Sequence, residues 1–316
     1  MMPGQFPQAD LNKVKTFSIR KRKSKVDIKS FAQPPRKAIS FSRFMDGLPH
    51  ILVGNSFRAV VEAVVKAKKQ HKPVLLMMGA HVIKCGLNPV LIELMKKKAL
   101  TGLAMNGACA IHDTEIAFHG ATSEEVREGL KDGSFGMVWE TGAFIHQAIG
   151  QGEALEQGFG EALGRALLGA RVPYHKLSLL AQASELKLPA TVHVAIGTDI
   201  IHQHPLADGA AMGETSFRDF KIFCEQVARL NNGGVVLNIG SAVLMPEVFL
   251  KALTIARNLH GRVRNFTTVN FDMLRQYRPR VNVVTRPVAE GGQGFDITGH
   301  HELMVPLLAQ AILEKL

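Results

Sequence analysis

Imidazole and carboxylate side chains stand together near the carboxyl end of the chain. His300-His301-Glu302 follows Gly299 and the glycine-rich run 291–294. Imidazole titrates close to neutral pH, so this combination suits proton transfer, with His300 or His301 as the group that takes the proton. The same residues also fit the start of a helix, where Glu302 would favour the helix dipole. The cluster is therefore either catalytic or the beginning of a C-terminal helix.

Two aspartates offer a second kind of chemistry. Asp199 comes directly after Gly197-Thr198, and Asp272 comes directly after Asn270-Phe271. A buried carboxylate at the end of a strand can hold a ribose hydroxyl or a cationic amine. Either aspartate could equally be a helix cap. The sequence leaves both roles open.

A metal site is a further alternative. His202-Gln203-His204, with Asp199 and Asp208, would supply imidazole and carboxylate ligands to a metal-dependent hydrolase. A His-x-His pair also occurs in ordinary loops, and no third strong ligand stands at motif spacing. We therefore predict that the chain holds no metal.

Alternating strands and helices must position these side chains. Short apolar runs typical of strands buried on both faces are separated by stretches with apolar residues at helical spacing. The expected strands are 74–78, 102–106, 190–196, 234–239, 266–271 and 281–284. Strands that alternate with helices of ten or more residues predict an α/β fold, a mostly parallel sheet with helices on both faces.

Small and polar residues follow five of these strands. In an open parallel sheet, ligands bind outside the carboxyl ends of the strands, so five such ends predict a nucleotide pocket. No GxGxxG fingerprint and no phosphate-binding loop is present, and glycines also punctuate ordinary loops. The five ends are Gly79-Ala80-His81, Asn106-Gly107-Ala108, Gly197-Thr198-Asp199, Gly240-Ser241 and Asn270-Phe271-Asp272.

Charge is concentrated in an N-terminal segment. Residues 1–40 hold ten Lys or Arg and two Asp, a net charge of +8 out of +11 for the chain. We predict a flexible basic arm over residues 1–38 and one domain over 39–316. Such an arm could bind nucleic acid, but like-charge blocks are more often solvated tails or arms that dock on a neighbouring subunit.

Composition excludes several other classes of protein. Apolar residues make up 46% of the chain and charged residues 21%, which is typical of a globular protein. No apolar run reaches the roughly 18 residues of a membrane span, and the N-terminus lacks the apolar core of a secretory signal. Three scattered cysteines cannot form a disulfide framework. We therefore expect a cytoplasmic protein without membrane contact.

Several segments, in the same order and at similar spacing, resemble deoxyhypusine synthase across roughly residues 39 to 302. The loop Gly79-Ala80-His81-Val-Ile-Lys-Cys85-Gly86 resembles the nicotinamide-dinucleotide loop of that family. The other similar segments are Ser40–Phe44, Gly54–Phe57, Asn106–Cys109 followed by His112, Asp113 and Glu115, Leu237–Val243, and Val269–Asp272.

The resemblance implies a Rossmann-like fold, NAD as cofactor, and a homotetramer with sites at subunit interfaces. The family removes hydride from spermidine, holds the aminobutyl group on a lysine as an imine, and passes it to a protein lysine. Asp199, His112, Asp113 and Glu115 would then contact substrate. The implied cofactor residues are Gly79, Ala80, His81, Cys85, Asn106, Gly107, Ala108, Gly240, Ser241, Asn270 and Asp272.

The chain departs from the family where the imine forms. Gly299 is followed by His300 instead of the imine-forming lysine, and no lysine lies between Lys251 and Lys315. Imidazole cannot form an imine with an aldehyde, because that intermediate needs a primary amine. Leu244-Met245 also replaces a Lys-His pair. We expect the pocket to be retained and standard deoxyhypusine formation to be lost.

The sequence thus predicts an NAD-dependent transferase or oxidoreductase of the deoxyhypusine-synthase type, performing hydride transfer on a small amine or alcohol. His300 or His301 would take the proton, and Asp199 would orient the substrate. One alternative is a non-catalytic NAD-binding or structural tetramer whose basic arm recruits a partner. The other is an aminobutyl transferase with a repositioned nucleophile such as Lys84.

Overall fold

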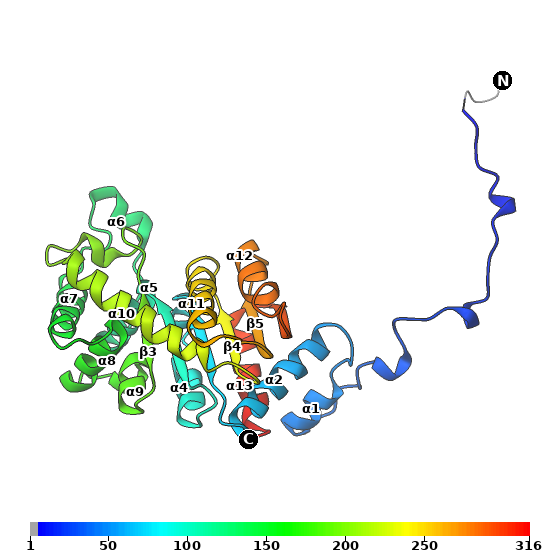
Figure 1. The fold of residues 1–316 in the computed structure, drawn as a ribbon, viewed down its shortest axis with the longest axis horizontal. Helices are drawn as coiled ribbons and strands as arrows, with labels where there is room; N and C mark the ends of the chain where they lie inside the picture. The colour runs from blue at the N-terminus through cyan, green and yellow to red at the C-terminus, as the bar shows by residue number, and fades with distance from the viewer. Residues whose placement is uncertain (1–5) are drawn as a thin grey trace.

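Six parallel strands form one sheet with helices on both faces. A computed structural model describes residues 6–316 (Figure 1). The strand order is β3-β2-β1-β4-β5-β6, and every neighbouring pair is parallel. The strands are β1 (Val74–Met78), β2 (Gly102–Asn106), β3 (Ala190–His193), β4 (Val235–Ile239), β5 (Phe266–Asp272) and β6 (Gly292–Thr298).

This order defines a doubly wound, Rossmann-like sheet. The chain adds β2 and β3 on one side of β1, then returns to add β4, β5 and β6 on the other side. The direction of winding therefore reverses between β1 and β4. Helices that leave these two strands diverge to opposite faces, and in doubly wound sheets this reversal point is where ligands bind. The expected α/β fold class is confirmed.

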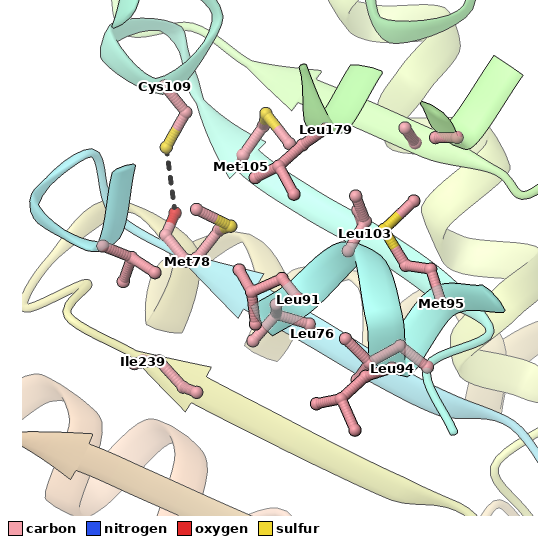
Figure 2. Packing of buried hydrophobic residues seen from close by; sticks show 14 of the residues in the cluster. Leu76, Met78, Leu91, Leu94, Met95, Leu103, Met105, Cys109, Leu179 and Ile239 are labelled. Atoms are coloured by element: carbon pink, nitrogen blue, oxygen red, sulfur yellow. Dashed lines mark hydrogen bonds between the residues drawn. The ribbon is translucent and has the colours of Figure 1, made fainter. Parts of the chain in front are cut away.

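The helices fill two hydrophobic cores, one on each face of the sheet. Leu76 and Met78 of β1 point into one core, whereas Leu75 and Met77 point into the other, as the two-residue period of a strand requires. Figure 2 shows part of the first core, where Leu76, Met78 and Leu91 pack together and Cys109 donates a hydrogen bond to the carbonyl of Met78 (3.7 Å).

The first core is covered by helices from both halves of the chain. They include α2 (Val53–Lys69), α4 (Asn88–Lys96), α5 (Gly107–His119), α7 (Trp139–Ala154), α8 (Phe159–Ala170), α9 (Leu179–Glu185) and α13 (His301–Leu313). The second core lies under α10 (Gly209–Ala228) and α11 (Leu244–His260). Shorter helices are α1 (Phe41–Gly47), α3 (His81–Lys84), α6 (Val126–Asp132) and α12 (Tyr277–Pro279).

Five of the six expected strands are present, and the sixth expectation is wrong. Residues 281–284 lie in a π-helical segment, Arg280–Thr285, and the last strand is the glycine-rich β6. A Cβ at Gly294 would stand 1.8 Å from the carbonyl oxygen of Val284, so β6 needs glycine where this segment packs on it. The pairing of β6 with β5 outweighs its weak strand propensity.

The N-terminal arm leads away from the body in Figure 1. Its described part carries three short turns, Leu11–Lys13, Ile19–Lys21 and Ile28–Ser30, each capped by a side chain. Residues 1–5 of the expected 1–38 arm lie outside the described residues. The arm joins the body through Ser30 and Gln33, whose backbones bond to His50 and Gly47. Within residues 6–316, no helix combines the length and apolar character needed to cross a bilayer.

Candidate functional site

The ends of β1 and β4 meet at the point where the winding reverses. Gly79 follows β1 and donates its N–H to the carbonyl of Ile239 (3.1 Å), the last residue of β4. A Cβ at Gly79 would stand 2.1 Å from the carbonyl oxygen of Gly240. The small residue at this strand end therefore lets the two backbones touch. Ala80 and His81 begin the short helix α3 directly above this contact.

His301 covers the other side of the same strand junction. Gly240 has φ +67°, and a Cβ there would stand 2.9 Å from the His301 ring. His301 is buried, and its Nε2 lies 3.4 Å from the carbonyl oxygen of Phe271. A carbonyl only accepts, so Nε2 carries the hydrogen in this contact. Nδ1 of the neutral ring then has a free lone pair, and this buried atom has no partner.

The electrostatic surroundings keep this imidazole neutral. Burial lowers the pKa of His301 below its ordinary value, and the Phe271 carbonyl and Asp272 only partly oppose that shift. His81 packs edge-on against His301, with ring centroids 5.6 Å apart. A neutral imidazole with an unused lone pair can accept a proton. His300, the neighbouring candidate, is exposed at the N-cap of α13.

Cys85 and Glu302 extend this cluster toward solvent. The Cys85 thiol lies 3.8 Å from the Glu302 carboxylate and donates to it. Burial and the negative charge of Glu302 raise the pKa of Cys85, so the thiol stays protonated and is a poor nucleophile. Lys84, the candidate for a repositioned imine lysine, is exposed at the end of α3.

A chain of amides and a carboxylate crosses the sheet beside the junction. Asn238 donates to Asn270 (2.8 Å), and Asn270 donates to Asp296 (2.9 Å). Asn238 also donates to the backbone carbonyl of Ser241, whose hydroxyl caps α11 at Met245. These contacts occupy Asn270 and Ser241 in holding strands and a helix together. Asp272 ends β5 beside His301 and accepts a bond from Leu274.

A second group of polar residues lies at the ends of β2 and β3. Asn106 caps α5 by accepting from the backbone N–H of Cys109 (3.2 Å). A Cβ at Gly107 would stand 2.2 Å from Oδ2 of Asp199, so the carboxylate fills the space that glycine leaves, beside Ala108. Oδ2 itself is buried and has no partner. Burial raises the pKa of Asp199, whereas His202 opposes that shift.

His202 fixes the loop that carries Asp199. Its Nδ1 accepts hydrogen bonds from the backbone N–H groups of Gly197 (3.0 Å) and Asp199 (3.2 Å). Nδ1 therefore lacks a hydrogen, so Nε2 is the donor of the neutral ring, and this atom has no partner. The Asp199 carboxylate and the His202 imidazole thus each leave one buried polar atom unused.

His112 and Glu115 form a hydrogen-bonded pair on α5. Nδ1 of His112 donates to the Thr122 hydroxyl (2.6 Å), which in turn donates to Glu115. Thr141 also donates to Glu115 (3.3 Å). Burial acts to raise the pKa of Glu115, but His112 and Thr122 outweigh it and hold the pKa below its ordinary value. Glu115 is therefore an ionised carboxylate next to His112, and His112 in turn acts on the pKa of Asp199.

Asp113 lies elsewhere, inside the helix layer. Its buried carboxylate accepts hydrogen bonds from Asn88 (3.1 Å), Ser178 (2.7 Å) and the backbone N–H groups of Leu179 (2.8 Å) and Leu180 (3.0 Å). These donors anchor the N-terminus of α9. The arrangement is that of a structural carboxylate and gives no support to the expected contact with substrate.

A stack of aromatic rings beyond β3 was not anticipated from the sequence. His146 packs against His204 with ring centroids 5.7 Å apart, and Trp139 contacts His204 at 4.9 Å. Nδ1 of His146 and Nε2 of His204 are buried without partners. The one signal in the sequence that could have indicated this cluster is a histidine that stands alone among the apolar residues of a helix. No group of three His, Cys, Asp or Glu within residues 6–316 is arranged to hold a metal.

Exposed apolar side chains rim the carboxyl edge of the sheet. Ile196 follows β3, Val243 follows β4, and Met273 and Leu274 follow β5, and all four are exposed. Five cavities form elsewhere among residues 6–316, and none of those five is lined by a residue of the edge site.

Three solved structures share the fold at low sequence identity. A protein of Entamoeba histolytica assigned as a deoxyhypusine synthase is 10% identical, covering 88% of this chain and 94% of its own, with a TM-score of 0.52. A conserved protein of Methanococcus maripaludis S2 assigned as LOR/SDH is 14% identical, covering 89% and 74%, with a TM-score of 0.52. At such identities the likeness shows the Rossmann-like fold alone.

The third structure is ArgZ, an arginine dihydrolase from the ornithine-ammonia cycle in cyanobacteria. It is 16% identical over 82% of this chain, with a TM-score of 0.50. The chain spans about a third of the length of ArgZ (31%). No protein-family model matches the sequence, and a search of curated protein sequences found no match.

Proposed function

We propose that this chain is an NAD-binding enzyme that transfers hydride from a small amine or alcohol at the carboxyl edge of its sheet. One observation carries the proposal: buried Asp199 and buried His301 each leave a polar atom without a partner on this edge. A buried unpaired polar group is costly and is rare unless a ligand or partner uses it. The edge is also where a doubly wound sheet binds ligands.

In this proposal, a dinucleotide would lie across the outside of the edge. The gaps at Gly79, Gly107 and Gly240 are filled by the chain's own atoms, so a ligand cannot insert between the strands there. It would instead contact Ala80 and His81 from outside. Oδ2 of Asp199 and Nδ1 of His301 are buried, so they would reach the ligand only after the side chains that cover them move. When bound, NAD supplies the hydride acceptor.

The side chains at the edge would then have separate roles in substrate binding and proton transfer. Asp199, with ionised Glu115 nearby, would hold a cationic or hydroxylated substrate in place. Nδ1 of neutral His301 would accept the proton that leaves the substrate amine or hydroxyl, and His81 would carry it toward solvent. This assignment favours His301 over His300, because His300 is exposed and far less constrained.

The test compares the two adjacent histidines. We expect wild-type protein to bind NAD in calorimetric titration and to form NADH with a polyamine or amino alcohol. His301→Gln removes the proton acceptor, so kcat/KM falls about 100-fold or more while NAD affinity stays within a few-fold. His300→Gln is the matched control and leaves the rate nearly unchanged.

The pH profile gives a second measurement on the same proteins. His301 must be neutral to accept a proton, so the rate falls in acid with an apparent pKa below the ordinary histidine value. Absence of NAD binding at millimolar concentration would end the proposal. Binding of NAD without turnover of any amine or alcohol would instead favour the non-catalytic alternative.

A homotetramer is the assembly that we propose for the edge site. The exposed rim of Ile196, Val243, Met273 and Leu274 supports this, since a second copy that covered the rim would also enclose a ligand lying across the edge.

A further inference from the structure

A large cavity lies at the opposite, amino-terminal edge of the sheet. Its volume is about 750 Å³, and its floor is formed by residues that enter three neighbouring strands. Pro73 precedes β1, Thr101 precedes β2, and Pro189 precedes β3. This volume is in the range of pockets that hold a small organic ligand. The cavity is independent of the proposed hydride-transfer site, which lies at the other ends of the same strands.

Positive side chains converge on this cavity from three segments of the chain. Lys68, Lys72, Lys98 and Arg229 line it, together with His71, and none of the twelve lining residues is acidic. The Lys72 ammonium donates to the backbone carbonyl of Asn231 (2.9 Å). Among the ion pairs formed by residues 6–316, none includes any of these four cations. The cavity therefore carries uncompensated positive charge.

Helix dipoles do not account for this charge. The helices α2, α4 and α10 end at Lys69, Lys96 and Ala228, so their negative ends lie near the cavity. Basic residues are commonly favoured there. Each helix end is equivalent to roughly half a negative charge. Three such ends offset less than half of four positive side chains, and a surplus of about 2.5 positive charges remains.

A buried amide in the same cavity has no hydrogen-bond partner. Gln226 is only 8% exposed, and both its Nε2 and its Oε1 are buried and unpartnered. Its Oε1 would stand 2.3 Å from a Cβ at Gly102, so glycine at the start of β2 makes room for it. An amide offers one donor and one acceptor side, which suits a neutral polar group of a ligand.

We propose that this amino-edge cavity binds a small phosphorylated metabolite with two or more negative charges. Lys68, Lys72, Lys98 and Arg229 would neutralise the phosphate oxygens, and Gln226 would bind a neutral polar group beside them. The cavity is a concave pocket partly open to solvent, which favours a small molecule over a nucleic acid, since a nucleic acid would need an extended basic surface. A ligand bound in the cavity would contact the ends of α2, α4 and α10, because these helix ends form the walls of the cavity.

Direct binding measurements test the proposal with defined probes. We expect inorganic pyrophosphate and ADP to bind the full-length protein saturably in calorimetric titration and to raise its Tm. The Lys98→Gln/Arg229→Gln double variant should weaken pyrophosphate binding at least about tenfold, because it removes two positively charged hydrogen-bond donors. Lys97→Gln changes a lysine that pairs with Glu93 outside the cavity and should bind as wild type.

Other outcomes overturn the site. If the double variant and Lys97→Gln lose the same amount of pyrophosphate affinity, the binding is non-specific charge attraction. Citrate as tight as pyrophosphate would show an anion site without preference for phosphate. Tight binding of a single-stranded oligonucleotide alone, or no saturable binding of either phosphate probe at millimolar concentration, would also reject the proposal. Circular dichroism of both variants verifies that they are folded.

Discussion

At the scale of single residues, identical side chains take different roles because their surroundings differ. Asp113 accepts four hydrogen bonds and holds α9, whereas Asp199 keeps one oxygen unused at the sheet edge. His300 and His301 are adjacent in sequence, yet one is exposed and the other is buried against Gly240. Position in the fold, and not residue type, separates the candidates for catalysis from the structural groups.

Asp219 provides a pH-dependent test of one such buried carboxyl group. Burial raises its pKa from the ordinary 3.8 to about 8, although Val192 and Gly160 donate to one of its oxygens. Between these pKa values the folded protein binds more protons at this site than the unfolded chain does. The free energy of unfolding therefore falls as pH rises through this window, by up to about 1.4 kcal/mol per pH unit.

We expect Asp219→Asn to remove this dependence. Asparagine keeps an oxygen for both backbone donors and cannot titrate. We would measure urea unfolding at about pH 5.5 and 7.5. Between these pH values, the free energy of unfolding of the wild type should fall by roughly 1 kcal/mol or more relative to that of the variant. Asp208→Asn, at the exposed N-terminus of α10, is the control and should keep the wild-type slope. Parallel slopes for wild type and Asp219→Asn would contradict the raised pKa.

At the scale of elements, the strand ends are closed by contacts between small residues and the chain itself. Position 79 requires glycine because the backbone at the end of β4 passes close to it, and position 107 requires glycine because Asp199 lies against it. The sequence correctly indicates glycine at these ends. It does not indicate whether the space beside each glycine is open to a ligand or occupied by other atoms of the chain. That depends on residues more than ninety positions away in the sequence.

Alanine at Gly79 should therefore weaken the junction of β1 and β4. The added methyl would stand 2.1 Å from the Gly240 carbonyl oxygen, and backbone must move to accept it. We expect the free energy of unfolding to fall by about 1–3 kcal/mol in urea unfolding. Gly213→Ala in α10 meets no atom and should raise it by up to about 1 kcal/mol. If Gly79→Ala leaves the free energy of unfolding unchanged, the backbones of β1 and β4 are not tightly packed at this junction.

At the scale of the whole molecule, the sheet presents two different edges. The carboxyl edge carries unpartnered polar atoms inside an apolar rim, and the amino edge carries a basic cavity. The basic arm extends away from the body on the side of α1 in Figure 1. Its binding of nucleic acid stays a prediction, as does the division into an arm and one domain.

The proposed homotetramer can be tested by the mass of the protein in solution. We expect light scattering to give about four times the 34.5 kDa chain mass, because the rim would be buried between copies. Leu274→Glu places charge in that interface and should shift the protein to smaller species. Leu130→Glu, on α6 and equally exposed at 65%, should leave the mass unchanged. A monomeric wild type would remove the support for assembly at this edge.

The sequence by itself determined the class of fold and predicted a site at the carboxyl ends of the strands. Buried apolar runs report strands, helical spacing reports the covering helices, and parallel strands place their carboxyl ends on one edge. Only the tertiary structure decided that β6 is the glycine-rich segment, that His301 and not His300 is buried, and that four distant segments form a basic cavity. Periodicity reports which face of an element is apolar, whereas convergence of remote side chains depends on long-range packing that no local pattern contains.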